Sequence, residues 1–109
     1  KKARAEALEA ATLYATEVPL KTMKAALEVF PLLGAMASDG NPNSVSDAGV
    51  GALAARSAVL GAQLNVRINA AGLNDREAAD RLCAEAADIA AKAIAAEAGI
   101  LAIVNQKIQ

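Results

Sequence analysis

Two clusters of polar side chains interrupt an otherwise apolar middle of the sequence, and both could bind or transform a ligand. The first cluster places one carboxylate beside amide and hydroxyl groups: Asn43, Ser44, Ser46 and Asp47. The second combines two amides with a cation: Asn65, Arg67 and Asn69. Amides offer paired donors and acceptors, a guanidinium binds carboxylates, and a lone carboxylate can move a proton. These residue types predict a substrate held by amides, hydroxyls and arginine, with Asp47 available for proton transfer.

Both clusters also have a purely structural interpretation. Ser44 lies three residues before Asp47, which is the spacing of a capping box at a helix start. Gly40 is expected to adopt the left-handed conformation that closes the preceding helix. Asn65 and Asn69 would then bond to a neighbouring helix, because a buried amide without a partner is costly. On the sequence alone the two interpretations stay open.

The composition excludes several kinds of active site. The 109 residues contain no histidine and one cysteine, so neither a Ser-His-Asp triad nor a zinc site is expected. We therefore expect no bound metal, and we expect Cys83 to be a small packed thiol. A net charge of −1 gives no electrostatic reason to bind nucleic acid, and no uncharged apolar run is long enough to span a membrane. The single cysteine and the lack of a visible signal peptide predict a cytoplasmic location.

The helical pattern divides the chain into about four segments. Lys1–Ala15 indicates a first helix, and Thr16 is expected to begin a second helix that Pro31 kinks. Asn74 predicts the start of a last helix that continues to the C-terminus. Alanine, the strongest helix former, dominates the sequence, while strand-forming residues are scarce. We expect an all-α bundle of about four helices, forming one domain over residues 1–109.

The segment Val45–Ala71 is expected to be the long, buried central helix of this bundle. Its apolar residues occupy more faces than three short helices can cover, which predicts self-association or pairing with a further helical segment. Asp47 and Asn65 are 18 residues apart, so a straight helix separates them by roughly 27 Å along its axis. Both clusters can meet one reacting atom only if the helix breaks, with Gly61 the favoured place, or if a second subunit supplies one cluster. We favour an antiparallel dimer, which sets Asp47 of one copy against Asn65 and Asn69 of the other.

Three motifs follow one another along the chain. They read Thr-Glu-Val-Pro-Leu at 16–20, Gly-Asn-Pro-Asn-Ser-Val-Ser-Asp-Ala-Gly-Val at 40–50, and Leu-Asn-Val-Arg-Ile-Asn at 64–69. In order and spacing they resemble signatures of the cyclodeaminase family, which includes the cyclodeaminase part of formiminotransferase-cyclodeaminase and the methenyltetrahydrofolate cyclohydrolases. Family members begin with a glycine-rich segment that has no counterpart here. The chain is therefore similar to the C-terminal part of such a domain, a little over half of it.

The resemblance implies an enzyme of tetrahydrofolate one-carbon metabolism, with a folate derivative as substrate and no separate cofactor. We expect a formiminotetrahydrofolate cyclodeaminase, in which ammonia leaves and 5,10-methenyltetrahydrofolate forms. The alternatives are a methenyltetrahydrofolate cyclohydrolase, in which water opens that ring, and a non-catalytic helical oligomerisation module. Asp47 is the expected catalytic residue, and the expected assembly is a homodimer or larger homo-oligomer. The expected substrate-binding residues are Asn43, Ser44, Ser46, Asn65, Arg67 and Asn69.

Overall fold

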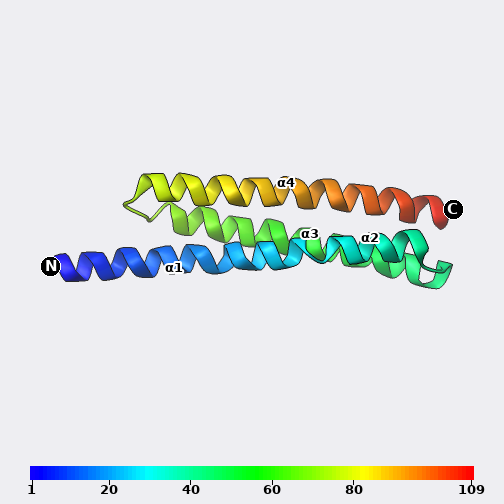
Figure 1. Cartoon of the computed structure of the whole chain (residues 1–109), viewed down its shortest axis with the longest axis horizontal. Coiled ribbons are helices and arrows are strands. Elements are labelled where there is room, and N and C mark those ends of the chain that lie inside the picture. Colours follow the sequence, from blue (N-terminus) through cyan, green and yellow to red (C-terminus); the bar gives the residue numbers. More distant parts are fainter.

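The computed structural model describes all residues, 1–109, as helices joined by short turns (Figure 1). The helices are α1 (Lys2–Leu27), α2 (Phe30–Asp39), α3 (Pro42–Ala70) and α4 (Arg76–Lys107). No strand is present, so the predicted all-α fold of about four helices is confirmed. α1 and α2 follow one another along one edge, α3 returns beside them, and α4 runs back along α3, giving a rod of 63 × 17 × 15 Å (Figure 1). None of these helices combines the length and the hydropathy that a membrane crossing requires.

α1 continues through Thr16 without a break, so the predicted helix start at this residue is wrong. The hydroxyl of Thr16 donates to the carbonyl oxygen of Thr12 at 2.8 Å, a bond made within a helix rather than at its start. Pro19 lies in the same helix and has no N–H to donate to the carbonyl of Ala15. The side-chain amide of Asn69 in α3 donates to that carbonyl instead, at 2.9 Å. The neighbouring helix thereby satisfies the group that the proline leaves free.

The kink expected at Pro31 is confirmed, because Glu28 and Val29 keep right-handed helical backbone angles and join α1 to α2 as one bent helix. α1 ends at Leu27, because continuing the helix would press the ring of Pro31 against the carbonyl of Leu27. α2 begins at Phe30, which places Pro31 in its first turn, where a missing N–H costs little.

α3 begins with a different cap from the predicted Ser44–Asp47 capping box, which is absent. The side chain of Asn41 accepts from the backbone amides of Asn43 and Ser44, at 2.9 and 3.2 Å, and acts as the N-cap. Pro42 occupies the first helical position, which proline favours. Asp47 consequently plays no part in capping α3.

Gly40 closes α2 in an extended conformation, with φ −72° and ψ 156°, and the predicted left-handed conformation is wrong. Glycine is needed here for space instead. A Cβ at this position would clash with the carbonyl oxygen of Met36 and the hydroxyl of Ser44. The tight turn between α2 and α3 therefore depends on a missing side chain rather than on an unusual φ.

α3 packs against all three other helices, which confirms its predicted central position. Small and β-branched residues fill its inner face, including the buried Val45, Ala48, Ala52, Val59 and Val66. Its opposite face is open in the single chain. Four apolar residues there, which we call the outer stripe, are between 49% and 72% exposed: Val50, Leu53, Leu64 and Ile68. In one copy the central helix is therefore buried on its inner face only.

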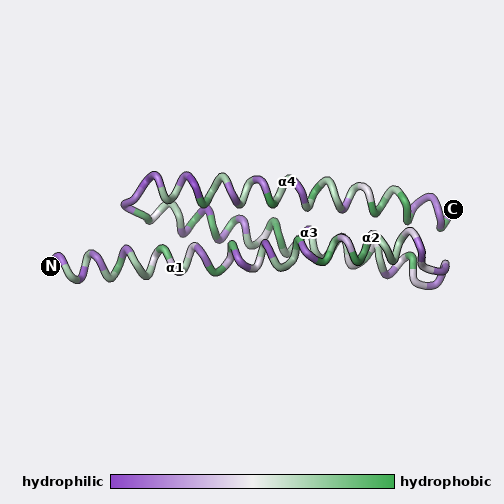
Figure 2. The backbone as a smooth tube through the Cα atoms, viewed as in Figure 1, coloured by the Kyte–Doolittle hydropathy of each residue, from purple (hydrophilic) through white to green (hydrophobic).

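α4 runs unbroken to Lys107, which confirms the predicted long last helix, and hydrophilic and hydrophobic residues alternate along it at helical spacing (Figure 2). Its N-cap is Asp75, whose side chain accepts from the amide of Ala78 at 3.0 Å, so the predicted cap at Asn74 is wrong by one residue. The backbone amides of Asn74 and Asp75 donate instead to the carboxylate of Glu9 in α1, at 2.8 and 2.9 Å. This carboxylate holds the turn between α3 and α4 against α1.

Candidate functional site

A groove between α1 and α3 brings the first and third motifs of the sequence together. It has a volume of about 450 Å³, which lies in the range of small-molecule sites. Its lining residues are Val18, Pro19 and Thr22 from α1, with Ala58, Ala62, Asn65 and Asn69 from α3. We call it the α1–α3 groove. Two motifs that are more than 40 residues apart in the sequence thus share one surface.

The two asparagines of the α1–α3 groove have different hydrogen-bonding roles. Asn69 is half-buried and uses its side-chain N–H to hold the carbonyl of Ala15, which is a structural role. Asn65 is exposed, and its side-chain amide makes no hydrogen bond within the chain. A free amide presents donors and an acceptor side by side, so Asn65 can pair with a ring that carries adjacent donor and acceptor atoms.

The carboxylate cluster lies at the start of α3, far from this groove. Asn43, Ser46 and Asp47 are exposed, while Ser44 is half-buried and donates its hydroxyl to the carbonyl of Asn41 at 3.1 Å. The carboxylate of Asp47 makes no hydrogen bond or ion pair within the chain, so it is open to solvent or to a partner. The structural interpretation of Asp47 as a helix cap does not hold.

The two clusters cannot meet within one copy of the chain. α3 is continuous past Gly61, so the expected alternative of a helix break there is wrong. Asp47 and Asn65 are therefore separated by roughly 27 Å along the axis of one helix. A site that uses both residues needs a second copy.

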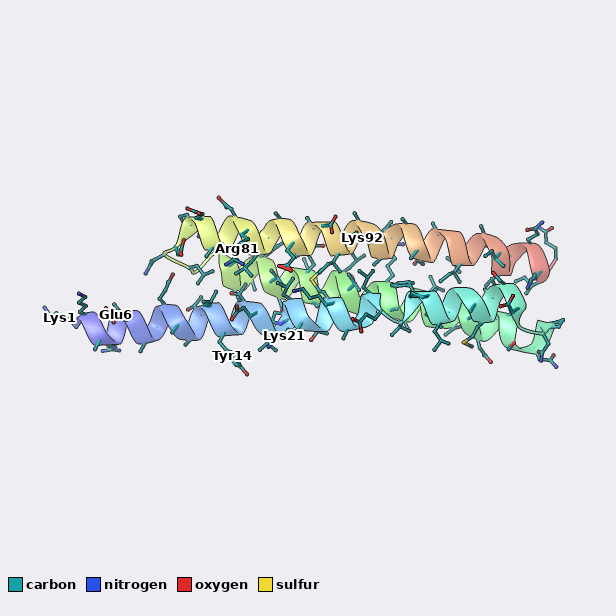
Figure 3. All side chains as sticks on the ribbon, viewed as in Figure 1. Lys1, Glu6, Tyr14, Lys21, Arg81 and Lys92 are labelled. Atoms are coloured by element: carbon teal, nitrogen blue, oxygen red, sulfur yellow. The ribbon has the colours of Figure 1, made fainter.

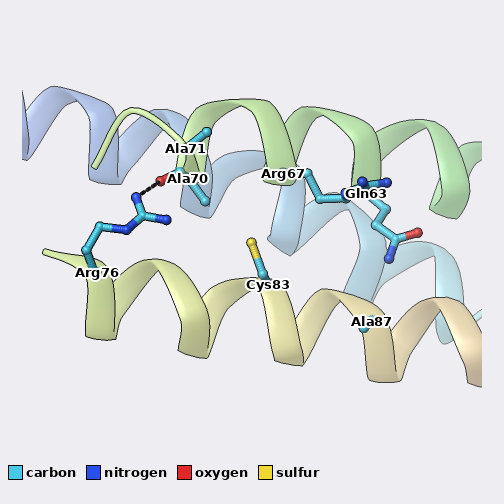
Figure 4. Close-up of a pocket in the computed structure, with 7 residues that line it drawn as sticks. All are labelled: Gln63, Arg67, Ala70, Ala71, Arg76, Cys83 and Ala87. Atoms are coloured by element: carbon cyan, nitrogen blue, oxygen red, sulfur yellow. Dashed lines mark hydrogen bonds between the residues drawn. The ribbon is translucent and has the colours of Figure 1, made fainter. Parts of the chain in front are cut away.

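Arg67 lies outside the α1–α3 groove. It lines a shallow depression on the outer face together with Leu64, Asn65 and Ile68. It also lines a pocket between α3 and α4, where Gln63 and Arg76 are its polar neighbours (Figure 4). Of the second cluster, the structure brings Asn65 and Asn69 into one groove, and it turns Arg67 towards the neighbouring surfaces.

Comparison with known proteins identifies the family. Residues 1–88 match the sequence model of the family described as formiminotransferase-cyclodeaminase. The chain belongs to this family. The resemblance inferred from the three motifs is thereby confirmed, and the α1–α3 groove is the place where two of those motifs meet in this family member.

A named relative extends the match over nearly the whole chain. It is the methenyltetrahydrofolate cyclohydrolase of Methylorubrum extorquens, which is 39% identical over 108 residues. The match covers 99% of this chain and 52% of the relative, so the chain spans about half the length of that relative.

One polar pair of this family member was not predicted from the sequence. A guanidinium nitrogen of Arg56 in α3 lies 3.2 and 3.3 Å from the two carboxylate oxygens of Glu97 in α4. The side chain of Glu97 is 7% exposed and that of Arg56 is 40% exposed. The available signal was a lone acid among alanines and isoleucines on the inner face of the last helix, which calls for a buried partner. The pair fixes the register of α3 against α4.

Proposed function

We propose that this chain is the substrate-binding helical part of a methenyltetrahydrofolate cyclohydrolase, an enzyme of tetrahydrofolate one-carbon metabolism. The observation that carries the proposal is the 39% identity, over 99% of the chain, to a relative of that name. The α1–α3 groove supports it, because its volume of about 450 Å³ suits a pteridine ring. No cofactor beyond the folate substrate is proposed.

Binding is assigned to the second polar cluster. The free amide of Asn65 pairs with the donor and acceptor edge of the pteridine, and the unused carbonyl oxygen of Asn69 accepts a further bond. Arg67 supplies the cation for a carboxylate of the glutamate tail. The apolar walls of the groove, formed by Val18, Ala58 and Ala62, pack against the ring.

Catalysis is assigned to Asp47, with Asn43, Ser44 and Ser46 orienting the reacting groups. Water adds through its oxygen to the methenyl carbon, and the carboxylate of Asp47 takes the proton that the water releases. The bond from that carbon to N5 of the folate then breaks, the proton passes to N5, and the hydroxyl of the adduct releases its remaining proton to solvent as the formyl C=O forms, so the cationic substrate and water give a neutral product and one proton. The product is 10-formyltetrahydrofolate. Atoms and charge balance without a metal or redox partner.

An antiparallel dimer would bring this carboxylate to the groove. Pairing two outer stripes about a centre near residue 59 sets Val50 opposite Ile68 of the partner and Leu53 opposite Leu64 of the partner. The same register sets Asp47 opposite the segment 69–71 of the other copy. At ~100° per residue, Asp47 and Asn65 lie on the same side of the stripe, and a twofold axis keeps them on that side. Each dimer would hold two equivalent sites.

A second candidate reaction is the cyclodeaminase reaction, which the description of the matched family favours. There N10 attacks the formimino carbon of 5-formiminotetrahydrofolate, and ammonia leaves. Both reactions pass through a tetrahedral carbon at the same one-carbon unit, so the same groove and the same carboxylate would serve either. The two differ in whether water or N10 is the nucleophile.

The test is turnover by the complete protein. Cyclohydrolase activity predicts a loss of the visible absorbance of 5,10-methenyltetrahydrofolate faster than its spontaneous hydrolysis, without ammonia. Asp47→Asn should remove most of this activity, whereas Asp80→Asn, an exposed acid on α4 outside the groove, should retain it. Ammonia release from 5-formiminotetrahydrofolate with no effect on the methenyl compound would select the deaminase instead. A protein inactive on both substrates would leave the oligomerisation module as the function.

A further inference from the structure

The pocket between α3 and α4, which we call the α3–α4 pocket, has the chemistry of an anion site. Its volume is about 330 Å³. Its lining residues are Gln63, Arg67 and Ala70 from α3, Ala71 directly after that helix, and Arg76, Cys83 and Ala87 from α4. Figure 4 shows the guanidinium of Arg67 beside Gln63 at one end of the pocket, and that of Arg76 towards the other end. Cys83 lies between them, with its sulfur directed towards α3.

The two guanidinium groups of this pocket have no acidic partner. The ion pairs of the chain join Lys24 to Glu85, Arg56 to Glu97 and Lys92 to Asp88, and no carboxylate lines the pocket. One nitrogen of Arg76 donates to the carbonyls of Ala70 and Leu73, at 3.3 and 3.0 Å, which holds this guanidinium in place and leaves its other donors unused. The guanidinium of Arg67 makes no hydrogen bond or ion pair within the chain. Two unpaired cations in one pocket attract a ligand with negative charge.

The placement of the two charges at opposite ends of the pocket selects the ligand class. Arg67 and Arg76 stand at opposite ends of the pocket with Cys83 between them, so a ligand that contacts both guanidiniums needs a negative charge at each of its ends (Figure 4). We propose that the α3–α4 pocket binds a dicarboxylate with a short hydrocarbon spacer, one carboxylate at Arg67 and the other at Arg76. The spacer then packs on the alanines, and Gln63 bonds to the carboxylate at Arg67.

Two sources could supply this dicarboxylate. One is the glutamate tail of the substrate, and this assignment rests on the proposed function. The other is a free diacid that binds independently of any folate. The chemistry of recognition is the same, and the closing experiment separates them.

Cys83 provides the measurement, since it is the single cysteine and lies inside the pocket. We expect glutarate to slow the alkylation of Cys83 by neutral iodoacetamide, at concentrations where butyrate and inorganic phosphate have no effect. Arg67→Gln should weaken protection by about tenfold or more, because it removes a charge-assisted bond. Arg81 is an exposed arginine on α4 outside the pocket, so in the Arg81→Gln variant glutarate should protect Cys83 as well as it does in the unmodified protein. Arg67→Gln leaves all hydrogen bonds of the chain in place, so loss of protection in this variant reports binding and not misfolding.

Comparing tetrahydrofolate with tetrahydropteroate, which lacks the glutamate, then shows which of the two sources supplies the dicarboxylate. Protection by tetrahydrofolate but not by tetrahydropteroate, lost in Arg67→Gln, identifies the substrate tail. Protection by glutarate that tetrahydrofolate does not compete with identifies a free diacid, and this result stands even if the protein turns over no folate. Equal protection by glutarate, butyrate and phosphate would overturn the proposal, as would full protection of Arg67→Gln by glutarate.

Discussion

The side chain of Asn69 donates to the backbone carbonyl that Pro19 leaves without a partner. The donor comes from α3 and the proline from α1, so two motifs remote in sequence depend on each other. Without this bond the carbonyl of Ala15 would have neither its backbone donor nor a side-chain donor. The relationship explains how a helix can carry a proline in its interior and stay continuous.

This dependence predicts non-additive effects on stability. Asn69→Ala should lower the free energy of unfolding by about 1 kcal/mol, the usual net value of one hydrogen bond. Pro19→Ala restores the N–H that the carbonyl of Ala15 lacks, so the same Asn69→Ala change should cost much less in that background. Urea unfolding of the two single variants and the double variant measures the difference. An equal cost of Asn69→Ala in both backgrounds would contradict the relationship.

The ion pair between Arg56 and Glu97 predicts an asymmetry. Arg56→Met leaves a nearly buried carboxylate without a cation, which should cost about 3–5 kcal/mol. Glu97→Gln should cost less, because the side chain of Arg56 is 40% exposed and can reach water. Thermal unfolding of both variants shows which of them loses more stability. A greater loss from Glu97→Gln than from Arg56→Met would show that the pair is not desolvated in this way.

The cap of α3 predicts that stability and function separate at its first turn. Asn41→Ala removes the side chain that accepts from two backbone amides, and should cost about 1 kcal/mol. Asp47→Asn touches no bond within the chain and should leave the unfolding midpoint unchanged. Parallel urea titrations test both statements, and a destabilised Asp47→Asn protein would mean that Asp47 has a structural role after all.

The differences between sequence and structure have identifiable physical causes. The long last helix was predictable, because its pattern continues from Asp75 to Lys107 without a proline. The start signals at Thr16 and Pro19 are typical of a new helix, and the pattern of α1 alone could not show that Asn69 would supply the missing donor. The capping box failed because Pro42 takes the first helical position and moves the cap to the residue before it.

The types of residue in the candidate site could be predicted from the sequence, but their arrangement in space could be predicted only in part. Asn65 and Asn69 share a groove because α1 packs along that side of α3, which their spacing alone does not specify. Arg67 follows Asn65 by two residues, so helical geometry turns it towards another face. The partner of Arg56 lies on a different helix, 41 residues away, and only packing reveals it.

The outer stripe of α3 predicts how the protein associates. Ile68→Glu should weaken self-association, because it places a carboxylate on the exposed apolar face through which two copies would meet. Tyr14→Glu is the matched control, since Tyr14 is also an exposed apolar side chain but points away from the bundle on α1 (Figure 3). Sedimentation velocity over a range of concentrations compares the two, and identical behaviour of both variants would argue against association through α3.

A composite site predicts that two inactive variants can restore each other. Mixed and refolded subunits carrying Asp47→Asn and Asn65→Ala should recover up to about a quarter of the normal turnover, because each mixed dimer holds one intact site of two. Neither variant alone should gain activity from the same treatment. A mixture that stays inactive, although mixed dimers form, would place both residues in sites within single copies or in none.

The rod shape of the chain leaves it with more surface than its mass requires. A compact monomer of 11.0 kDa would expose about 5,600 Å² to solvent. This chain exposes 6645 Å². The excess, about 1,000 Å², is close to the ~800 Å² that one partner contributes to an interface of ordinary size. Covering one side of the rod would therefore bring the solvent-exposed area of each copy to that of a compact globular protein of the same mass.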